Sequence, residues 1–148
     1  MPNWCYNRFR VTGSAEDVAR FQKQAVGFYP WCKPEPEQAE NVLNFHGLVP
    51  IPPEVLAAGY QPGGKAWERR HWGCNFGACR AAVTEQWQGG VLYEFDTAWS
   101  PSVRFVESVS RAWPTLLFVL DYEEPILGFK GLARAKAGAL DDHCIKLY

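Results

Sequence analysis

Residues 91–122 read VLYEFDTAWSPSVRFVESVSRAWPTLLFVLDY, and this stretch decides the fold. Val91–Thr97 and Thr115–Tyr122 are rich in β-branched and aromatic residues, which predicts two strands. The residues between them are apolar at three- and four-residue spacing, which predicts a helix with one apolar face. These apolar positions are Val103, Val106, Val109 and Trp113.

The ends of this helix are predicted from three residues. Ser100 is a favoured N-cap residue, because its hydroxyl accepts a hydrogen bond from the first turn. Pro101 suits the first helical position, where its missing N–H costs nothing, and Pro114 ends the helix. The resulting β-α-β unit predicts a sheet with a helix packed across it. It does not indicate any enzymatic activity.

The first strand is predicted at residues 4–12, WCYNRFRVT, which alternate between two faces. One face carries Cys5, Asn7, Phe9 and Val11, and the other carries Tyr6, Arg8 and Arg10. A helix then begins at Ser14, where Asp17 completes a start that resembles a capping box. Its apolar face consists of Val18, Phe21 and Ala25, and Gly27 is predicted to end it.

Two further runs, Arg80–Trp87 and Val91–Thr97, predict a hairpin around Gln88-Gly89-Gly90. A two-residue Gly-Gly loop would place Glu85 opposite Glu94, where like charges repel. A three-residue loop, with Gly90 in the left-handed conformation, avoids that contact. It places Val83 opposite Phe95, facing the helices, and Glu85 opposite Tyr93. The charge argument therefore favours the three-residue loop.

The predicted order is β-α-β-β-α-β, which is the ferredoxin-like arrangement of an α+β sandwich. Residues 129–136 add a further strand, and residues 143–147 add a short last one. A chain of 148 residues is long enough for one domain with a substantial core, so we expect a single domain over residues 1–148.

Residues 28–76 form a long insertion before the hairpin. Val42–Val49 is predicted as a short strand, residues 54–56 as a turn of helix and Ala66–Trp72 as two helical turns. Aromatic side chains are concentrated here: Phe28, Tyr29, Trp31, Tyr60, Trp67, Trp72 and Phe76. They can form a satellite core under the loops, or some can remain exposed as a contact surface.

Composition limits the function classes. The formal net charge is −1, so the chain lacks the overall positive field that attracts nucleic acid. It has 5 cysteines, an odd number without a Cys-x-x-Cys pair, and no signal peptide or stretch long enough to cross a membrane. We therefore expect a cytoplasmic protein with free thiols.

Metal binding and catalysis are both disfavoured. His71, Cys74, Cys79 and Cys144 are residue types that bind zinc, but the usual paired cysteine spacing is absent. No nucleophile elbow, HExxH helix or phosphate-binding loop occurs. We therefore expect no enzyme, no metal site and no cofactor.

Several runs together resemble one known family. They are Met1-Pro2-Asn3-Trp4-Cys5-x-Asn7, Phe45-x-x-Leu48-x-Pro50-x-Pro52, Trp72-Gly73, Phe95-Asp96-Thr97-Ala98-Trp99-Ser100-Pro101, and Tyr122-Glu123-Glu124 with Gly128-Phe129-x-Gly131. Over nearly the whole chain the sequence resembles the YubB-type ferredoxin-like domain family, small proteins typical of plasmids and phages. It departs at Ser102, where the family commonly has a second proline, and at Cys74-Asn75-Phe76, where Thr-Lys-Trp is common. The resemblance implies the fold and an origin in a mobile genetic element, and it brings no catalytic residues.

Two functions follow as hypotheses. The first is a non-enzymatic binding protein that contacts a protein of the bacterial host, with a host defence component as the target that this genetic setting suggests. Its predicted contact residues are Trp31, Tyr60, Trp67, Arg70 and Trp72. Whichever of Trp67 and Trp72 points outward is expected to carry the contact.

The second hypothesis is a nucleic-acid-binding accessory protein. The RRM module has the same strand and helix order and stacks bases on the open face of its sheet. The matching face here would carry Tyr6, Arg8, Arg10, Lys130, Arg134 and Lys136. However, Arg80–Trp87 contains no basic, glycine and aromatic run of the RRM type, and analogy of fold alone does not establish function.

Overall fold

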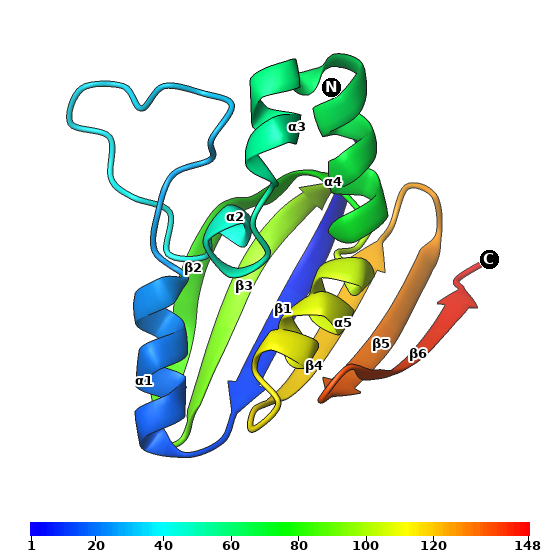
Figure 1. The fold of residues 1–148 in the computed structure, drawn as a ribbon. Coiled ribbons are helices and arrows are strands. Elements are labelled where there is room, and N and C mark those ends of the chain that lie inside the picture. The colour runs from blue at the N-terminus through cyan, green and yellow to red at the C-terminus, as the bar shows by residue number, and fades with distance from the viewer.

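The computed structural model describes residues 1–148, and its centre is a six-stranded antiparallel sheet in the order β2-β3-β1-β4-β5-β6. Figure 1 shows the helices packed over one face of this sheet. The strands are β1 (Trp4–Thr12), β2 (Asn75–Trp87), β3 (Gly90–Ala98), β4 (Leu117–Glu124), β5 (Phe129–Lys136) and β6 (Ala139–Lys146). The helices are α1 (Ala15–Gln24), α2 (Phe45–Leu48), α3 (Pro53–Ala58), η1 (Tyr60–Gly64), α4 (Lys65–His71) and α5 (Val103–Ala112).

The predicted fold class is confirmed. Strands β2-β3-β1-β4 with helices α1 and α5 have the order and pairing of a ferredoxin-like β-α-β-β-α-β domain. Strands β5 and β6 extend the sheet beyond β4, as Figure 1 shows. The last strand is longer than predicted, since it starts at Ala139. No helix is long and apolar enough to cross a membrane.

The core lies between the sheet and its helices. Phe9 of β1 is fully buried, and its ring contacts Phe21 of α1, Phe105 of α5 and Phe118 of β4 at centroid distances of 5.7–6.5 Å. Strand β1 alternates as predicted, because its odd-numbered residues from Cys5 to Val11 are buried and its even-numbered ones are exposed. The pleat of this strand therefore sets the boundary between core and open face.

The predicted hairpin register is wrong. Val83 lies opposite Tyr93, Glu85 lies opposite Leu92, and Val83 is 37% exposed. The pairing shifts between Val83 and Glu85 and at two places nearer the start of β2, so neither alternative register applies. Because each shift changes the partner of every residue before it, charge pairing at the loop could not determine the rest of the register.

The loop of this hairpin is also shorter than predicted. Trp87 pairs with Gly90, which leaves Gln88 and Gly89 as the loop, and Gly89 is the residue with positive φ, +89°. A Cβ on Gly89 would lie 2.8 Å from the carbonyl oxygen of Gly13, so the turn is closed against the first βα loop. Gly90 belongs to strand β3.

Two helix ends differ from the prediction. Helix α5 begins at Val103, and Ser102 occupies the N-cap position without a side-chain hydrogen bond to the helix. Ser100 is not the cap, because its hydroxyl donates to the carbonyl oxygen of Gly73 at 2.6 Å. Helix α1 ends at Gln24, before Gly27, while its predicted N-cap Ser14 does accept from the N–H of Asp17.

The insertion contains helices where one strand was predicted. Phe45–Leu48 forms the short helix α2, so the strand prediction for Val42–Val49 is wrong. The apolar residues there do not alternate: Leu43, Phe45 and Leu48 are all buried on the same side, against the core. The helical predictions near residues 54–56 and 66–72 are confirmed by α3 and α4.

Candidate functional site

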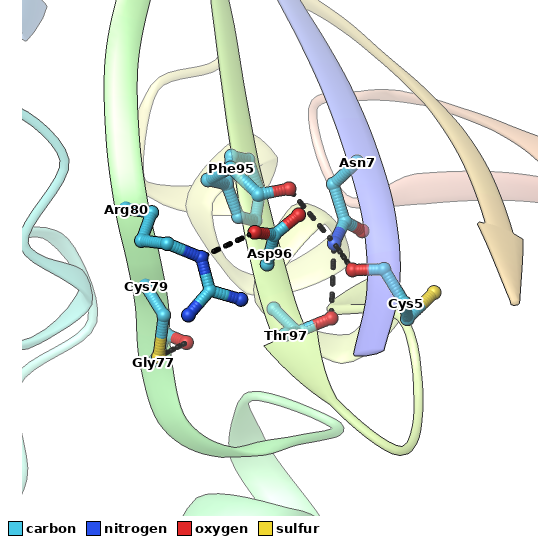
Figure 2. Close-up of polar contacts among 8 residues, drawn as sticks. All are labelled: Cys5, Asn7, Gly77, Cys79, Arg80, Phe95, Asp96 and Thr97. Atoms are coloured by element: carbon cyan, nitrogen blue, oxygen red, sulfur yellow. Dashed lines mark hydrogen bonds and ion pairs between the residues drawn. The ribbon is translucent and has the colours of Figure 1, made fainter. Parts of the chain in front are cut away.

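Three polar residues of the motifs, Asn7, Thr97 and Ser100, form a chain of hydrogen bonds. Asn7 Nδ2 donates to Thr97 Oγ1 at 2.9 Å and to the carbonyl oxygen of Cys5 at 3.0 Å. The Thr97 hydroxyl donates to the carbonyl oxygen of Ser100 at 2.6 Å, and the Ser100 hydroxyl donates to Gly73. Figure 2 shows the amide nitrogen of Asn7 on β1 reaching both the backbone of Cys5 and the side chain of Thr97 on β3. These polar residues therefore connect β1, β3 and the segment after α4, so their hydrogen bonds stabilise the fold.

The motif at residues 122–131 also stabilises the fold. Glu124 is fully buried, and its carboxylate accepts from the backbone N–H groups of Ile126 and Leu127, which shapes the turn into β5. A Cβ on Gly131 would lie 2.3 Å from the hydroxyl oxygen of Tyr122, so glycine is required for the close packing of β4 on β5. Several residues that carry the family resemblance therefore have structural roles: Asn7, Thr97, Ser100, Glu124 and Gly131.

A buried carboxylate holds the insertion to the sheet. Glu68 of α4 is 0% exposed; it accepts from the Tyr29 hydroxyl at 2.6 Å and from the N–H of Phe76 at 2.9 Å. Burial raises the pKa of Glu68, and these two hydrogen bonds oppose that change in part. Burial and the bond to Glu68 raise the pKa of Tyr29. The cluster therefore positions the start of β2.

Three aromatic rings meet where β2 starts and β3 ends. The ring of Phe76 lies 6.3 Å from that of Tyr60 and 6.5 Å from that of Trp99. Phe76 is 39% exposed and Trp99 is 47% exposed, so these are large apolar side chains open to solvent. These three rings, together with Trp4 and Arg80, form the surface that we call the aromatic end surface: Trp4, Tyr60, Phe76, Arg80 and Trp99.

Arg80 connects these rings to the open face of the sheet. Its guanidinium lies 4.1 Å from the ring centroid of Trp4 and donates from Nε to Asp96 Oδ2 at 2.8 Å. Figure 2 shows Arg80 on β2 pointing across to Asp96 on β3. An arginine stacked on an aromatic ring and the amphipathic ring of tryptophan are typical of interface hot spots.

Backbone strain is concentrated at the same place. Phe76, Arg80 and Trp99 have positive φ angles of 74°, 53° and 64°. Side chains other than glycine rarely adopt this conformation, and bulky ones pay roughly 1–3 kcal/mol for it. Here the strain turns two aromatic rings and one guanidinium toward solvent at the end of the sheet. Strain that presents side chains in this way is characteristic of functional surfaces.

Beside the aromatic end surface, the open face carries a groove of about 360 Å³. Tyr6, 53% exposed, lies at its centre, with Asp96 of β3 and Glu123 of β4 directly opposite in register. In the next row Arg8 lies between Glu94, 3.4 Å away, and Asp121. The groove is lined by four carboxylates, those of Glu94, Asp96, Asp121 and Glu123, and by two basic side chains, Arg8 and Lys130. Lys130 lies opposite Glu123 in register without forming an ion pair, so the lining has an excess of negative charge.

The structure separates the predicted contact residues. Trp72 is 0% exposed and donates from Nε1 to the carbonyl oxygen of Val49, so it belongs to the core and its prediction as a contact residue is wrong. Trp67 is half-buried and stacks on His71 at 4.6 Å, with Arg70 exposed nearby. Trp67 and Arg70 lie on α4.

Trp31 and Tyr60 occupy a different part of the insertion. Both are half-buried and contact each other edge to face at 5.5 Å. Trp31 covers Gly64, where a Cβ would lie 2.4 Å from its ring. Of the predicted set, Tyr60 is the one that reaches the aromatic end surface, while Trp31 and Trp67 pack against the main core that contains Trp72.

The predicted nucleic-acid residues do share one face. Tyr6, Arg8 and Arg10 of β1 and Lys130, Arg134 and Lys136 of β5 all point away from the helices. Strand β4 lies between them, however, and places Asp121 and Glu123 in the middle of this face. Carboxylates at the centre of the surface would repel a phosphate backbone.

The cysteines do not assemble into a metal site. No group of three or more His, Cys, Asp or Glu side chains is placed to hold a metal ion. Cys79 and Cys144 lie on β2 and β6, the opposite edges of the sheet. Burial raises the pKa of Cys5 to about 12, and it raises the pKa of Cys74 well above its ordinary value.

The sequence did not predict Arg80 or Trp99 as contact residues, and it did not distinguish Phe76 from the other aromatic residues of the insertion. The strand alternation that buries Phe95 and Thr97 would also bury Trp99, and the left-handed backbone reverses its direction. The one available signal was the glycine pair around the start of β2, Gly73 and Gly77, which permits an irregular strand.

Comparison with known proteins agrees with this fold. A family model described as "Ferredoxin-like domain in Api92-like protein" matches residues 79–146, from within β2 to the end of β6. The chain is similar to the crystal structure of a protein api92 from Yersinia pseudotuberculosis, with a TM-score of 0.74 and 10% sequence identity. That alignment covers 97% of this chain and 98% of the other. No curated protein matches the sequence.

Proposed function

We propose that this chain is a non-enzymatic binding protein that contacts a protein partner through its aromatic end surface. The observation that carries the proposal is the presentation of Phe76 and Trp99 to solvent from strained backbone. Large apolar side chains that lie together on a surface, rather than singly, are typical of interaction sites. Trp and Arg dominate the binding energy of protein interfaces.

The charge of the adjoining groove favours a protein over a nucleic acid. The partner would place basic side chains against Asp121 and Glu123, which have no ion pair of their own. Electrostatic complementarity of this kind steers association and selects among partners. Phosphates would meet the same carboxylates and be repelled.

The chemistry of the thiols supports a role without catalysis. A cysteine attacks as the thiolate, and the raised pKa values of Cys5 and Cys74 keep both thiols protonated at neutral pH. The buried hydrogen bonds of Asn7, Thr97 and Ser100 are used within the fold.

The genetic setting comes from the family resemblance. We place the chain among YubB-type proteins of plasmids and phages on its Phe95–Pro101 motif, and the Api92-like match of residues 79–146 supports the same fold family. A protein of such an element acts in the cytoplasm of its bacterial host. A host defence component is the partner we propose for it.

A pull-down from bacterial host lysate tests this function. The native chain is expected to retain a discrete protein that Trp99→Ala loses, while Glu16→Ala, an exposed change on α1, retains it. Equal retention by all three would contradict the proposal. Salt-sensitive binding of the native chain to a mixed-sequence oligonucleotide would instead support the nucleic-acid hypothesis.

A further inference from the structure

The two edges of the sheet are built differently. Edge strand β2 is irregular: its pairing with β3 shifts at three places, and Phe76 and Arg80 have positive φ. Such bulges prevent another strand from adding to an edge. Strand β6 pairs with β5 in unbroken register from Ala139 to Lys146, and Figure 1 shows it as the outermost strand on its side. This edge has no bulge to protect it.

The free backbone groups of β6 belong to alternate residues. The N–H of Leu147 donates to the carbonyl oxygen of Gly128, which continues the register of β5 with β6. Hydrogen-bonded pairs alternate along an antiparallel ladder, so residues 141, 143 and 145 direct their N–H and C=O groups to β5. Residues 140, 142, 144 and 146 therefore direct theirs outward, where another strand could pair.

We propose that β6 pairs with β6 of a second copy of this chain, antiparallel about a two-fold axis at Cys144. In this register Asp142 of each copy lies opposite Lys146 of the other, so the two copies form two equivalent ion pairs. Asp142 Oδ1 accepts from the Tyr122 hydroxyl at 2.8 Å, which leaves Oδ2 for the lysine. Opposite charges at facing positions stabilise antiparallel strands. A self-complementary patch of this kind is what a two-fold dimer requires.

Neighbouring registers are worse. An axis at Asp142 would place the two Asp142 carboxylates opposite each other, where they repel. An axis at His143 would place Asp142 opposite Cys144 and leave Lys146 facing Leu140, without an ion pair. Of the three registers, the charges of β6 favour the one centred on Cys144.

The exposed apolar residues of this edge fit the same arrangement. Ile145 is 61% exposed and Leu132 of β5 is 50% exposed, both on the face away from the helices. The axis at Cys144 places Ile145 opposite His143 of the second copy, so both Ile145 side chains approach the axis. Pairing of short strands buries less than the 1,200–2,000 Å² or so of a standard interface, so the dimer depends on concentration.

Analytical ultracentrifugation of the full chain is the test. The weight-average mass is expected to rise from 16.8 kDa toward twice that value between about 10 µM and 1 mM. Lys146→Asp places like charges opposite each other and should abolish the rise. Adding Asp142→Lys to that variant restores opposite charges and should restore the rise. Because Asp142→Lys also removes the bond from the Tyr122 hydroxyl, circular dichroism of the double variant must match that of the native chain.

Disulfide trapping tests the position of the axis. Directly opposed residues have Cα atoms roughly 5.5 Å apart, within the range that a disulfide spans. Mild oxidation should therefore yield a covalent dimer of the native chain and of Cys32→Ser, and none of Cys144→Ser. Cys32 and Cys144 are the two exposed cysteines, so Cys32→Ser is the matched control.

Three results would overturn the proposal: a constant monomer mass, a mass rise that Lys146→Asp leaves unchanged, or covalent dimers that form through Cys32. Trp99→Ala leaves β6 untouched and should dimerise like the native chain. Its behaviour separates this inference from the function proposed for the aromatic end surface.

Discussion

The hydroxyl of Tyr29 donates a 2.6 Å hydrogen bond to Oε2 of Glu68, a carboxylate with no exposure to solvent. The bond joins two parts of the insertion that are 39 residues apart in the chain. The second oxygen of the same carboxylate accepts from Phe76, the first residue of the aromatic end surface along β2. Order in the insertion and the placement of that surface therefore depend on one buried acid.

This acid should make stability depend on pH. Because burial raises the pKa of Glu68, the folded chain binds more protons than the unfolded chain between the ordinary value of 4.5 and the raised value. Stability contributed by Glu68 is therefore greatest below pH 4.5 and is lost as pH rises through that window. Urea denaturation of Glu68→Gln should show that the variant gains stability relative to the native chain as pH rises from about 4.5 to about 8.

Glu54→Gln is the control for that measurement, since Glu54 lies exposed on α3. Its stability difference from the native chain should stay constant over the same pH range. If the Glu68→Gln difference is equally constant, the carboxyl titrates at the same pH in the folded and unfolded chains, and the proposed burial effect fails.

The hydrogen bonds of Thr97 should contribute strongly to stability. Thr97→Val keeps the shape of the side chain and removes the oxygen that joins Asn7 to Ser100, leaving the buried amide of Asn7 short of a partner. We expect a loss of about 1–3 kcal/mol in the free energy of unfolding. Thr115→Val removes an exposed bond to Asp17 and should cost no more than about 0.5–1 kcal/mol. Equal losses would contradict this account of the network.

Gly89 should tolerate no side chain. Its φ of +89°, and the 2.8 Å that would separate a Cβ from the carbonyl oxygen of Gly13, mean that Gly89→Ala strains the hairpin. A loss of about 1–3 kcal/mol is expected in urea denaturation. Gly63→Ala is the comparison, because nothing lies within 4 Å of its Cβ position. A Gly89→Ala variant as stable as the native chain would contradict the left-handed conformation at this position.

Regular elements were predictable from the sequence because their periodicity is local. The alternation of β1, the apolar face of α1 and the bounds of β5 all follow from side-chain spacing. The hairpin register was not predictable, because bulges in β2 depend on how its glycines and Phe76 pack against the insertion. A single extra residue there changes every partner before it.

The candidate site was predictable only in part. The number of tryptophans predicts that some are core residues and others contact residues. Assigning each one requires the tertiary structure. Trp72 reaches Val49 across the insertion, and Trp99 faces outward through its left-handed backbone. Neither the contact of Trp72 nor the direction of Trp99 can be predicted from the periodicity of the sequence. The hydroxyl of Ser100 likewise bonds to Gly73, 27 residues away, and so Ser100 does not cap the helix beside it.

The two neighbouring tryptophans Trp67 and Trp72 should respond differently to truncation. Trp72→Ala removes a fully buried ring and should cost about 3–5 kcal/mol, with a large drop in melting temperature by circular dichroism. Trp67→Ala removes a half-buried ring and should cost less, about 2–3 kcal/mol, leaving the fold intact. The pull-down then shows whether Trp67, the outward member of the pair, also contributes to partner binding. If Trp67→Ala unfolds the chain as well, both rings are core.

The most direct measurement of the central claim is site-specific photocrosslinking in bacterial host lysate. A benzophenone amino acid replaces Trp99 in one sample and Glu16 in a second, since α1 begins at the opposite end of β1 from the aromatic end surface. We predict a discrete protein adduct from position 99 and none from position 16. Adducts of equal yield at both positions, or a nucleic-acid adduct at position 99, would contradict the claim that the aromatic end surface binds a protein.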